Sequence, residues 1–228
     1  MKNLLDSKRN EQLIQSMIKT KVILLLLLFL IGVTPLFSQT KNPQLSHWEA
    51  LISRQLIYPK EARISKKEGL VVISLSTGLD SNLTEIKLEK NAGKLFDDQT
   101  LKAVENVRDL WTDDMIADRE PGETYLLVFN YYFLKEGNSK QDRIKSAMNL
   151  IQKGKPEKAL QIAERMVNEN PYDATGLQLS SQINRQLGEE AAATSDLLAY
   201  QEMSEKVLTQ IDIKVYTVVT TRTVTGTF

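Results

Sequence analysis

The residues of this sequence that could carry out catalysis are few and poorly combined. His47 is the single histidine and the chain has no cysteine. These absences remove thiol nucleophiles, cysteine metal sites, histidine pairs and disulfide bonds. Ser46 lies beside His47, but a catalytic triad is assembled in space and needs a third residue that orients the histidine. Adjacency of the two residues along the chain therefore does not indicate a triad.

Three pairs of neighbouring carboxylates are the other residues with chemical potential: Asp97-Asp98, Asp113-Asp114 and Glu189-Glu190. Paired carboxylates can share acid and base roles, but adjacent residues on a helix point in different directions. No pair is accompanied by a signature for a base, a metal or a phosphate loop. Each pair fits a helix amino terminus or a solvated turn better. We therefore predict a protein that is not an enzyme, with no catalytic, metal-binding or cofactor-binding residues and no cofactor.

Composition sets the broad class. The 228 residues are 42% hydrophobic and 25% charged, which suits one or two globular domains and argues against a disordered chain. Lysine plus arginine and aspartate plus glutamate both total 29. No global field attracts the chain to nucleic acid, so we expect protein partners and no nucleic acid.

The amino terminus is typical of a signal peptide. Residues 22–33, VILLLLLFLIGV, are apolar and follow Lys19 and Lys21, and this run is shorter than the roughly 20 residues of a usual spanning helix. We expect cleavage near residue 39 and a mature chain in the periplasm. The alternative is a retained anchor in the inner membrane that faces the periplasm. Met17 is a candidate for the true start.

The helices and strands predicted for the first domain follow the apolar run along the chain. Apolar spacing predicts a helix over residues 42–57 and a short helix over 59–65. Alternating residues predict two strands joined by a turn, then a helix that covers the hairpin, then a long closing strand. Their ranges are 70–77, 83–90, 95–111 and 124–134. The order of helix, strand, strand, helix and strand predicts a small α+β domain with an antiparallel sheet over residues 40–137.

This order of elements, together with the residues at their ends and turns, resembles the TonB C-terminal domain family over about residues 45–135. The residues that carry the resemblance are Tyr58, Pro59, Ala62, Gly69, Gly78, Leu101, Val104, Trp111, Gly122 and the closing aromatic strand. In that family the domain binds the amino-terminal box of outer-membrane receptors by adding it as a strand beside the last strand of the sheet. The resemblance thus implies an outer-membrane receptor or envelope transport component as partner. It also implies that the partner binds through backbone hydrogen bonds to an edge strand formed by Thr124, Tyr125, Leu126, Leu127, Val128, Phe129, Asn130 and Tyr131. We expect the side chains of Leu127, Phe129 and Tyr131 to be core.

The transducers of that family also carry a retained anchor and a long Pro-rich arm across the periplasm. Here the six prolines are scattered, and only residues 39–45 separate the apolar run from the first helix. A membrane-anchored energy transducer is therefore one alternative rather than the first expectation.

The second half has an internal repeat. Gly154 and Gly188 are separated by the same interval as Ala159 and Ala193, and this interval is the tetratricopeptide period of about 34 residues. Residues 140–207 thus resemble two degenerate tetratricopeptide (TPR) repeats, an all-α unit, with a generic helical hairpin as the alternative. The repeats would present a peptide groove, or only a solvated face, at Gln141, Ile144, Met148, Gln178, Gln182 and Arg185.

The tail, residues 208–228, changes to a Thr- and Val-rich pattern of high strand propensity from Ile211 onward. One hypothesis is a strand that pairs with the free sheet edge of the first domain and so inhibits it. The alternatives are a frayed tail or a strand that forms a dimer. Three functions remain: a periplasmic module that binds receptors by strand addition, a TPR adaptor for envelope assembly, and an energy transducer.

Overall fold

The computed structural model describes residues 42–135 and 137–216; the apolar run and residues 217–228 of the tail lie outside them. The first helix, α2 (Pro43–Gln55), begins where Asn42 accepts hydrogen bonds from the backbone N–H groups of Gln44 and Leu45 at 2.9 and 3.3 Å. A proline in the first turn suits this start because its missing N–H would have no partner there. One face of α2 is buried, as the apolar spacing predicted, at Leu45, Trp48, Glu49 and Ile52.

The short helix α3 (Lys60–Ile64) leads into a hairpin of β1 (Gly69–Thr77) and β2 (Leu83–Lys90). The two strands pair antiparallel, and the turn between them is closed by the Gly78 N–H, which donates to the Asn82 carbonyl at 2.9 Å. Val71, Ile73 and Leu75 of β1 are fully buried on one face of the sheet. The alternation in the sequence therefore marked the core face correctly.

Helix α4 (Lys94–Glu105) is shorter than the predicted helix over residues 95–111. After Val107 the chain forms two 3-10 turns, η1 (Arg108–Leu110) and η2 (Asp113–Ile116). The physical reason is tertiary: the Val107 carbonyl accepts from the Trp48 indole at 2.9 Å, and the Trp111 indole donates to the Ser81 carbonyl at 3.0 Å. These bonds to other elements replace the last helical turn.

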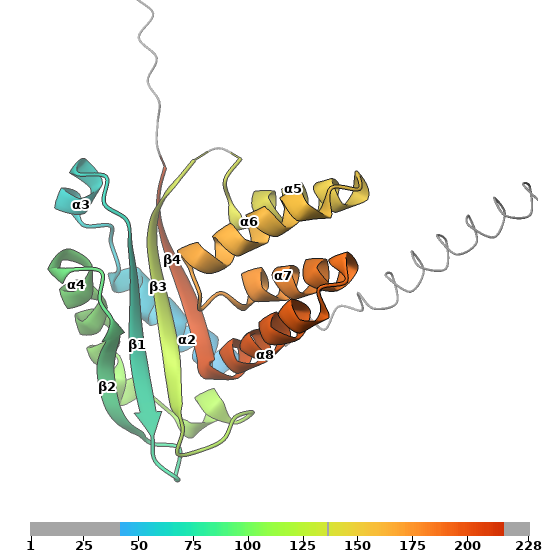
Figure 1. The fold of residues 1–228 in the computed structure, drawn as a ribbon. Helices are drawn as coiled ribbons and strands as arrows, with labels where there is room; N and C mark the ends of the chain where they lie inside the picture. Colours follow the sequence, from blue (N-terminus) through green and yellow to red (C-terminus); the bar gives the residue numbers. More distant parts are fainter. Residues whose placement is uncertain (1–41, 136, 217–228) are drawn as a thin grey trace, which may run out of the picture. The chain divides into compact units, whose positions relative to one another are not determined.

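Strand β3 (Thr124–Leu134) has the predicted bounds and pairs antiparallel with β1. Four helices follow: α5 (Lys140–Gln152), α6 (Pro156–Glu169), α7 (Ala174–Leu187) and α8 (Glu190–Lys206). The last strand, β4 (Val207–Tyr216), begins directly after α8 and returns to the sheet beside β3 (Figure 1). The strand order is β2-β1-β3-β4.

The three strands predicted for residues 40–137 pair antiparallel, as expected, whereas the added strand β4 pairs parallel with β3 and makes the sheet mixed. Four intervening helices carry the chain back to the end of the sheet at which β3 begins, and a crossover of this kind joins parallel strands. The fold is α+β, with a four-stranded mixed sheet and seven α-helices in the described residues.

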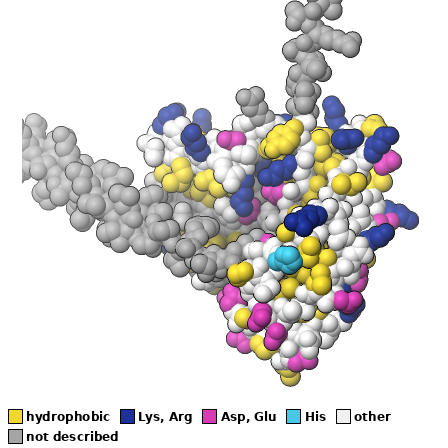
Figure 2. All heavy atoms as spheres, turned by 180° about the vertical axis from the view of Figure 1, so that it is seen from behind, with side chains coloured by type: hydrophobic (Ala, Val, Ile, Leu, Met, Phe, Trp, Pro, Cys, Tyr) yellow, Lys and Arg dark blue, Asp and Glu magenta, His cyan; other side chains and the backbone are white. Residues whose placement is uncertain are grey.

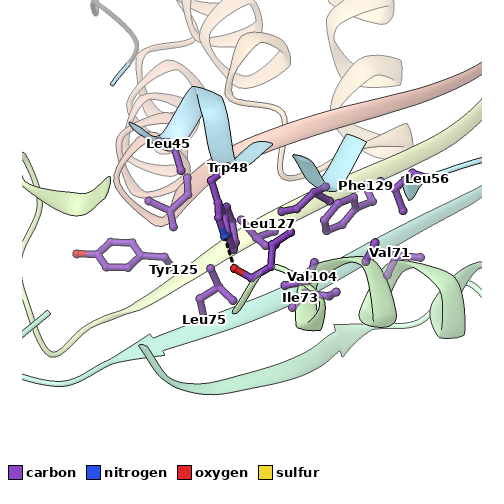
Figure 3. Close-up of a cluster of buried hydrophobic side chains, with 14 of the residues drawn as sticks. Leu45, Trp48, Leu56, Val71, Ile73, Leu75, Val104, Tyr125, Leu127 and Phe129 are labelled. Atoms are coloured by element: carbon purple, nitrogen blue, oxygen red, sulfur yellow. Dashed lines mark hydrogen bonds between the residues drawn. The ribbon is translucent and has the colours of Figure 1, made fainter. Parts of the chain in front are cut away.

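The main core lies between one face of the sheet and helices α2 and α4. Figure 3 shows side chains from α2, α4, β1 and β3 converging there, with the Trp48 indole hydrogen-bonded to a backbone carbonyl. Residues Leu208, Ile211 and Ile213 of β4 contribute to the same cluster. The strand that arrives last in the sequence thus completes the core of the first domain. A second, smaller core joins α5, α6 and α7 around Ala147, Ala159, Ala163, Met166, Leu179 and Ile183.

Candidate partner-binding site

Strand β3, where the sequence placed the partner-binding edge, is an interior strand. It pairs with β1 from Thr124 to Tyr131 on one side and with β4 from Leu126 to Leu134 on the other. The expectation of a free edge at β3 is therefore wrong in this structure. The physical reason is that the chain fills the edge with its own strand, so the backbone groups of β3 already have partners.

The side chains of β3 differ in their exposure to solvent. Leu127, Phe129 and Tyr131 have no exposed surface, which agrees with their expected place in the core. Tyr125 and Val128 are also buried, Leu126 and Asn130 are half-buried, and Thr124 is exposed. Only the first of the eight predicted binding residues therefore offers an exposed side chain.

Strand β4 is held by more than its pairing with β3. Arg119 donates from its guanidinium to the carbonyl oxygens of Glu205 and Val207, where α8 passes into β4. Leu208 is 6% exposed. Tyr132 donates its hydroxyl to Asp212 across the two strands at 3.3 Å. The expectation of a strand from residue 211 pairing with the sheet describes β4, which begins four residues earlier, at Val207. Residues 217–228 lie outside the described part.

The two outer strands of the sheet are β2 and β4. On β2, Glu85, Lys87 and Glu89 are all exposed, and charged side chains of this kind discourage a further strand from pairing. On β4 the charged residues are Asp212 and Lys214, which pair with each other at 3.5 Å. Glu85 and Lys87 of β2 also pair, at 3.1 Å, but β2 has three exposed charged side chains and β4 has one, Lys214.

The seven residues predicted as the family motif lie around the first domain. Tyr58 follows α2 and stacks edge-on against Phe96 and Tyr131, with ring centroids 5.9 Å apart in both cases. Its hydroxyl donates to the carbonyl of Lys67, so Tyr58 ties the α3 loop to the core. Pro59 precedes α3 as its N-cap, and Ala62 within that helix is fully buried.

The glycines and the tryptophan of the motif have separate roles. A side chain at Gly69 would place its first carbon 2.7 Å from the Ala92 side chain and 2.9 Å from the Phe96 ring, so only glycine fits the close approach of α4 to β1. Gly122 has φ +81°, a left-handed conformation that favours glycine. Gly78 lies in the hairpin turn, and Trp111 packs edge-on against Trp48 at 5.6 Å.

One part of the chain matches a known protein family. Residues 54–112 match the family model of the Gram-negative bacterial TonB protein C-terminal. This TonB C-terminal segment runs from the end of α2 to Thr112 and includes every motif residue except Gly122. Strands β3 and β4 lie outside it, so the matched residues do not include the predicted binding edge.

A comparison with solved structures found one that is similar to part of this chain. The NMR solution structure of the Helicobacter pylori TonB C-terminal domain is 30% identical, and the match covers 38% of this chain and 88% of that one, with a TM-score of 0.27. No curated protein matches the chain. Among residues 42–135 and 137–216, no helix is long and apolar enough to cross a membrane.

The Tyr58 hydroxyl of the TonB C-terminal segment gives a prediction about alkaline pH. Burial, with the nearby Glu68 carboxylate second, raises the pKa of Tyr58 to about 12. Because this folded-state pKa lies above the usual value of 10.0, the contribution of Tyr58 to stability is complete below about pH 10 and is lost as pH rises toward 12. We expect Tyr58→Phe to show a shallower fall in melting temperature between pH 10 and 12 than the wild type.

Burial also raises the pKa values of Tyr125, Tyr131 and Tyr132, so the Tyr58→Phe variant should keep part of the alkaline dependence. Thermal unfolding followed by circular dichroism between pH 8 and 12 measures the difference. Identical slopes for the variant and the wild type would show that Tyr58 does not contribute.

The helical half that follows the TonB C-terminal segment keeps a regular spacing. Helices α5 and α7 begin at 140 and 174, and α6 and α8 at 156 and 190, so both pairs of starts are separated by the same interval as Gly154 and Gly188. These two glycines have φ of +67° and +82°, the conformation expected of glycines that turn one helix into the next. Ala159 and Ala193 are fully buried. The assignment of these helices to the TPR family stays a prediction.

The six residues predicted for a peptide groove do not share one environment. Ile144 and Met148 pack against the helical core, Gln178 is half-buried, and Gln141, Gln182 and Arg185 are exposed. None of the six lines the polar cavity that the structure has beside α5 and α6. A groove at these residues stays a prediction.

The residues first considered for catalysis are dispersed. His47 is exposed on α2 and lies at the surface in Figure 2. Asp97 accepts from the backbone N–H groups of Ala92 and Gly93 at 2.8 and 3.1 Å, the role at a helix amino terminus that the sequence favoured. Asp113 and Glu189 also lie at the starts of η2 and α8. In the described residues no group of three or more His, Cys, Asp or Glu could hold a metal ion.

Proposed function

We propose that this chain is a protein-interaction module of the cell envelope that takes up an extended segment of a partner by β-strand addition. The family match of residues 54–112 supports the class of function. TonB C-terminal domains belong to envelope transport, so the partner proposed is an outer-membrane receptor or another transport component, met in the periplasm. The single observation that carries the site is the position of β4 as an outermost strand of the sheet.

The partner segment is proposed to add to β4 rather than to β3. Displacing β4 would break nine backbone-paired positions and expose Leu208, which is buried in the main core. Addition outside β4 requires neither loss. A strand edge presents backbone N–H and C=O groups that an incoming strand can satisfy, which gives affinity, while alternate side chains give specificity. The charges on β2 argue against the opposite edge.

A disulfide between β3 and β4 tests this placement. Leu134 and Tyr216 are register partners at the far end of the pairing, and neighbouring strands lie about 4.8 Å apart, within the range that a disulfide can span. The chain has no native cysteine, so Leu134→Cys with Tyr216→Cys places the only two thiols. Helix α8 already holds the other end of β4, so the oxidised variant cannot release the strand.

We expect the oxidised and reduced forms to bind a synthetic receptor-box peptide with the same dissociation constant as the wild type, measured by fluorescence anisotropy. The single variant Leu134→Cys controls for loss of the leucine. Binding that disappears on oxidation and returns on reduction would place the partner on β3 after release of β4, the autoinhibitory alternative. An absence of binding by both forms and by the wild type would reject the proposed function for this partner.

A photo-cross-linker attached to a single cysteine locates the edge directly. Lys214→Cys on β4 and Lys87→Cys on β2 are matched, since both lysines are exposed on outer strands. The bound peptide should cross-link to position 214 and not to position 87. The reverse pattern would move the proposed site to β2.

The repeated helices favour a second candidate, a TPR adaptor for envelope assembly in which the sheet only docks the protein. Their starts recur at one constant interval, at 140 and 174 and at 156 and 190. In that case changes at Gln178 and Arg185 would reduce partner capture more than changes on β4. An energy transducer is the third candidate and requires an uncleaved amino terminus. Cell fractionation with amino-terminal sequencing of the mature chain separates it from an exported protein.

A further inference from the structure

A polar cavity of about 420 Å³ lies between the sheet and the first helix pair, α5 and α6. Its walls come from the start of β1, the second half of β3, β4, the start of α5 and the end of α6. Small-molecule sites have volumes of roughly 300–1,000 Å³, so the cavity has room for a ligand of several non-hydrogen atoms. The strand-addition proposal uses the backbone edge of β4 and not this cavity, and none of the residues of the predicted TPR groove lines it.

The helical wall contains a buried donor without an acceptor. Asn170, at the end of α6, is 6% exposed. Its side-chain oxygen accepts from the Tyr172 backbone N–H at 3.1 Å, but its Nδ2 has no hydrogen-bond partner among the described residues. Buried amide donors in proteins are nearly always paired, because an unpaired one is costly. An oxygen atom of a ligand would supply the missing acceptor.

The sheet wall is also polar. Asn130 and Tyr132 of β3 and Gln210 and Asp212 of β4 line the cavity. Gln210 donates its side-chain N–H to Asp212 at 3.3 Å, and Tyr132 donates its hydroxyl to the other oxygen of Asp212 at the same distance. This wall is therefore preorganised by hydrogen bonds between two strands, and it offers both donors and acceptors to a ligand.

The charges around the cavity nearly cancel. Lys140 pairs with Asp173 at 2.7 Å, Arg143 pairs with Glu169, and Asp212 faces Lys214. Two exposed residues of opposite sign remain among the lining residues, Lys135 and Glu68. A site with charges of both signs and a net charge near zero suits a ligand that also carries both signs, rather than a simple anion or cation.

We propose that this cavity binds a short peptide in its zwitterionic form, with a carboxylate or carbonyl oxygen of the ligand accepting from Asn170 Nδ2. Lys135 attracts the carboxylate end of the peptide and Glu68 the ammonium end. The tyrosine and amide side chains of the sheet wall contact the main chain between them. Binding of a peptide in this cavity does not depend on strand addition at β4.

Isothermal titration of the full-length chain with trialanine tests the proposal. Asn170→Asp keeps the oxygen that accepts from Tyr172 and replaces the unpaired donor nitrogen with an acceptor. We expect it to weaken binding by about tenfold or more, the effect of losing one hydrogen bond to a charged group. Lys135→Gln, at an exposed position, should weaken binding severalfold. Gln201→Glu makes the same change in charge at an exposed position of α8, outside both the cavity and the predicted TPR groove, and should bind like the wild type.

Trialanine with an acetylated amino terminus, and trialanine with an amidated carboxyl terminus, should each bind more weakly than the free peptide. These two ligands and Lys135→Gln keep the test decisive if Asn170→Asp does not fold. No heat of binding with the wild type, or equal affinity for free and blocked peptides, would overturn the proposal and leave a cavity filled by water only. Equal affinity of folded Asn170→Asp and the wild type would also overturn it.

Discussion

Replacing Trp48 by alanine is expected to lower the free energy of unfolding by about 3–5 kcal/mol, the usual cost of removing a large aromatic side chain from a core. Trp48 has no exposed surface. Its indole donates to the Val107 carbonyl at 2.9 Å and meets the Trp111 ring edge-on, with centroids 5.6 Å apart. The substitution therefore removes apolar burial, a buried hydrogen bond and an aromatic contact together. Urea unfolding measured by far-UV circular dichroism gives the difference.

Two further variants separate these contributions. Trp48→Phe keeps most of the apolar volume and loses the N–H, so its cost should be clearly smaller than that of Trp48→Ala. Ile57→Ala removes an apolar side chain that is 69% exposed and should change stability by less than about 0.5 kcal/mol. A loss below about 1 kcal/mol for Trp48→Ala would mean that α2 does not pack as the structure describes.

Ending the chain after Lys206, which removes β4, is expected to destabilise the sheet severely. Leu208 is 6% exposed, and Ile211 and Ile213 pack against the same core. Burial of one such leucine is worth about 2–5 kcal/mol relative to alanine, whereas a whole domain has a net stability of only about 5–15 kcal/mol. We expect the shortened chain to lose most of its cooperative thermal transition, as measured by differential scanning calorimetry.

A chain that ends after Tyr216 is the matched control, because it keeps all of β4. It should retain the wild-type transition. If the chain ending at Lys206 also retained the wild-type transition and bound a receptor-box peptide more tightly, β4 would be dispensable for folding and would block the edge of β3. That result would favour autoinhibition over the outer edge of β4 as the binding site.

The contrast between β3 and β4 shows where sequence reasoning was sufficient. The pattern TYLLVFNYYFL predicted the bounds of β3 and the burial of Leu127, Phe129 and Tyr131. The Thr- and Val-rich tail predicted a strand near residue 211. Neither pattern could assign which strand pairs with which, because a strand apolar on both faces is equally compatible with an edge or an interior position. The pairing of β4 with β3 depends on where the four helices α5 to α8 bring the chain back to the sheet. That position is set by long-range contacts and not by the local sequence.

Helix α4 shows a second limit. Val107 is buried in the main core and Trp111 is partly buried against it, which agrees with the expectation that the segment over residues 95–111 covers the hairpin. The helix nevertheless ends at Glu105, because Val107 and Trp111 make hydrogen bonds to α2 and to the hairpin turn. Local periodicity reports which residues face the core, but tertiary hydrogen bonds decide where regular structure stops.

The sequence by itself determined most elements of the first domain, the residues of its core face, the resemblance to the TonB C-terminal family, whose model matches residues 54–112, and the constant repeat spacing of the helical half. These features depend on local periodicity, on glycine and proline positions, and on residue identity. Only the tertiary structure decided that β4 closes the edge of β3, that Arg119 fixes the end of α8, and that Asn170 borders a polar cavity. The physical reason is that backbone pairing and cavity walls join residues far apart along the chain, for example Leu70, Asn130 and Asp212, and no local pattern records such distances.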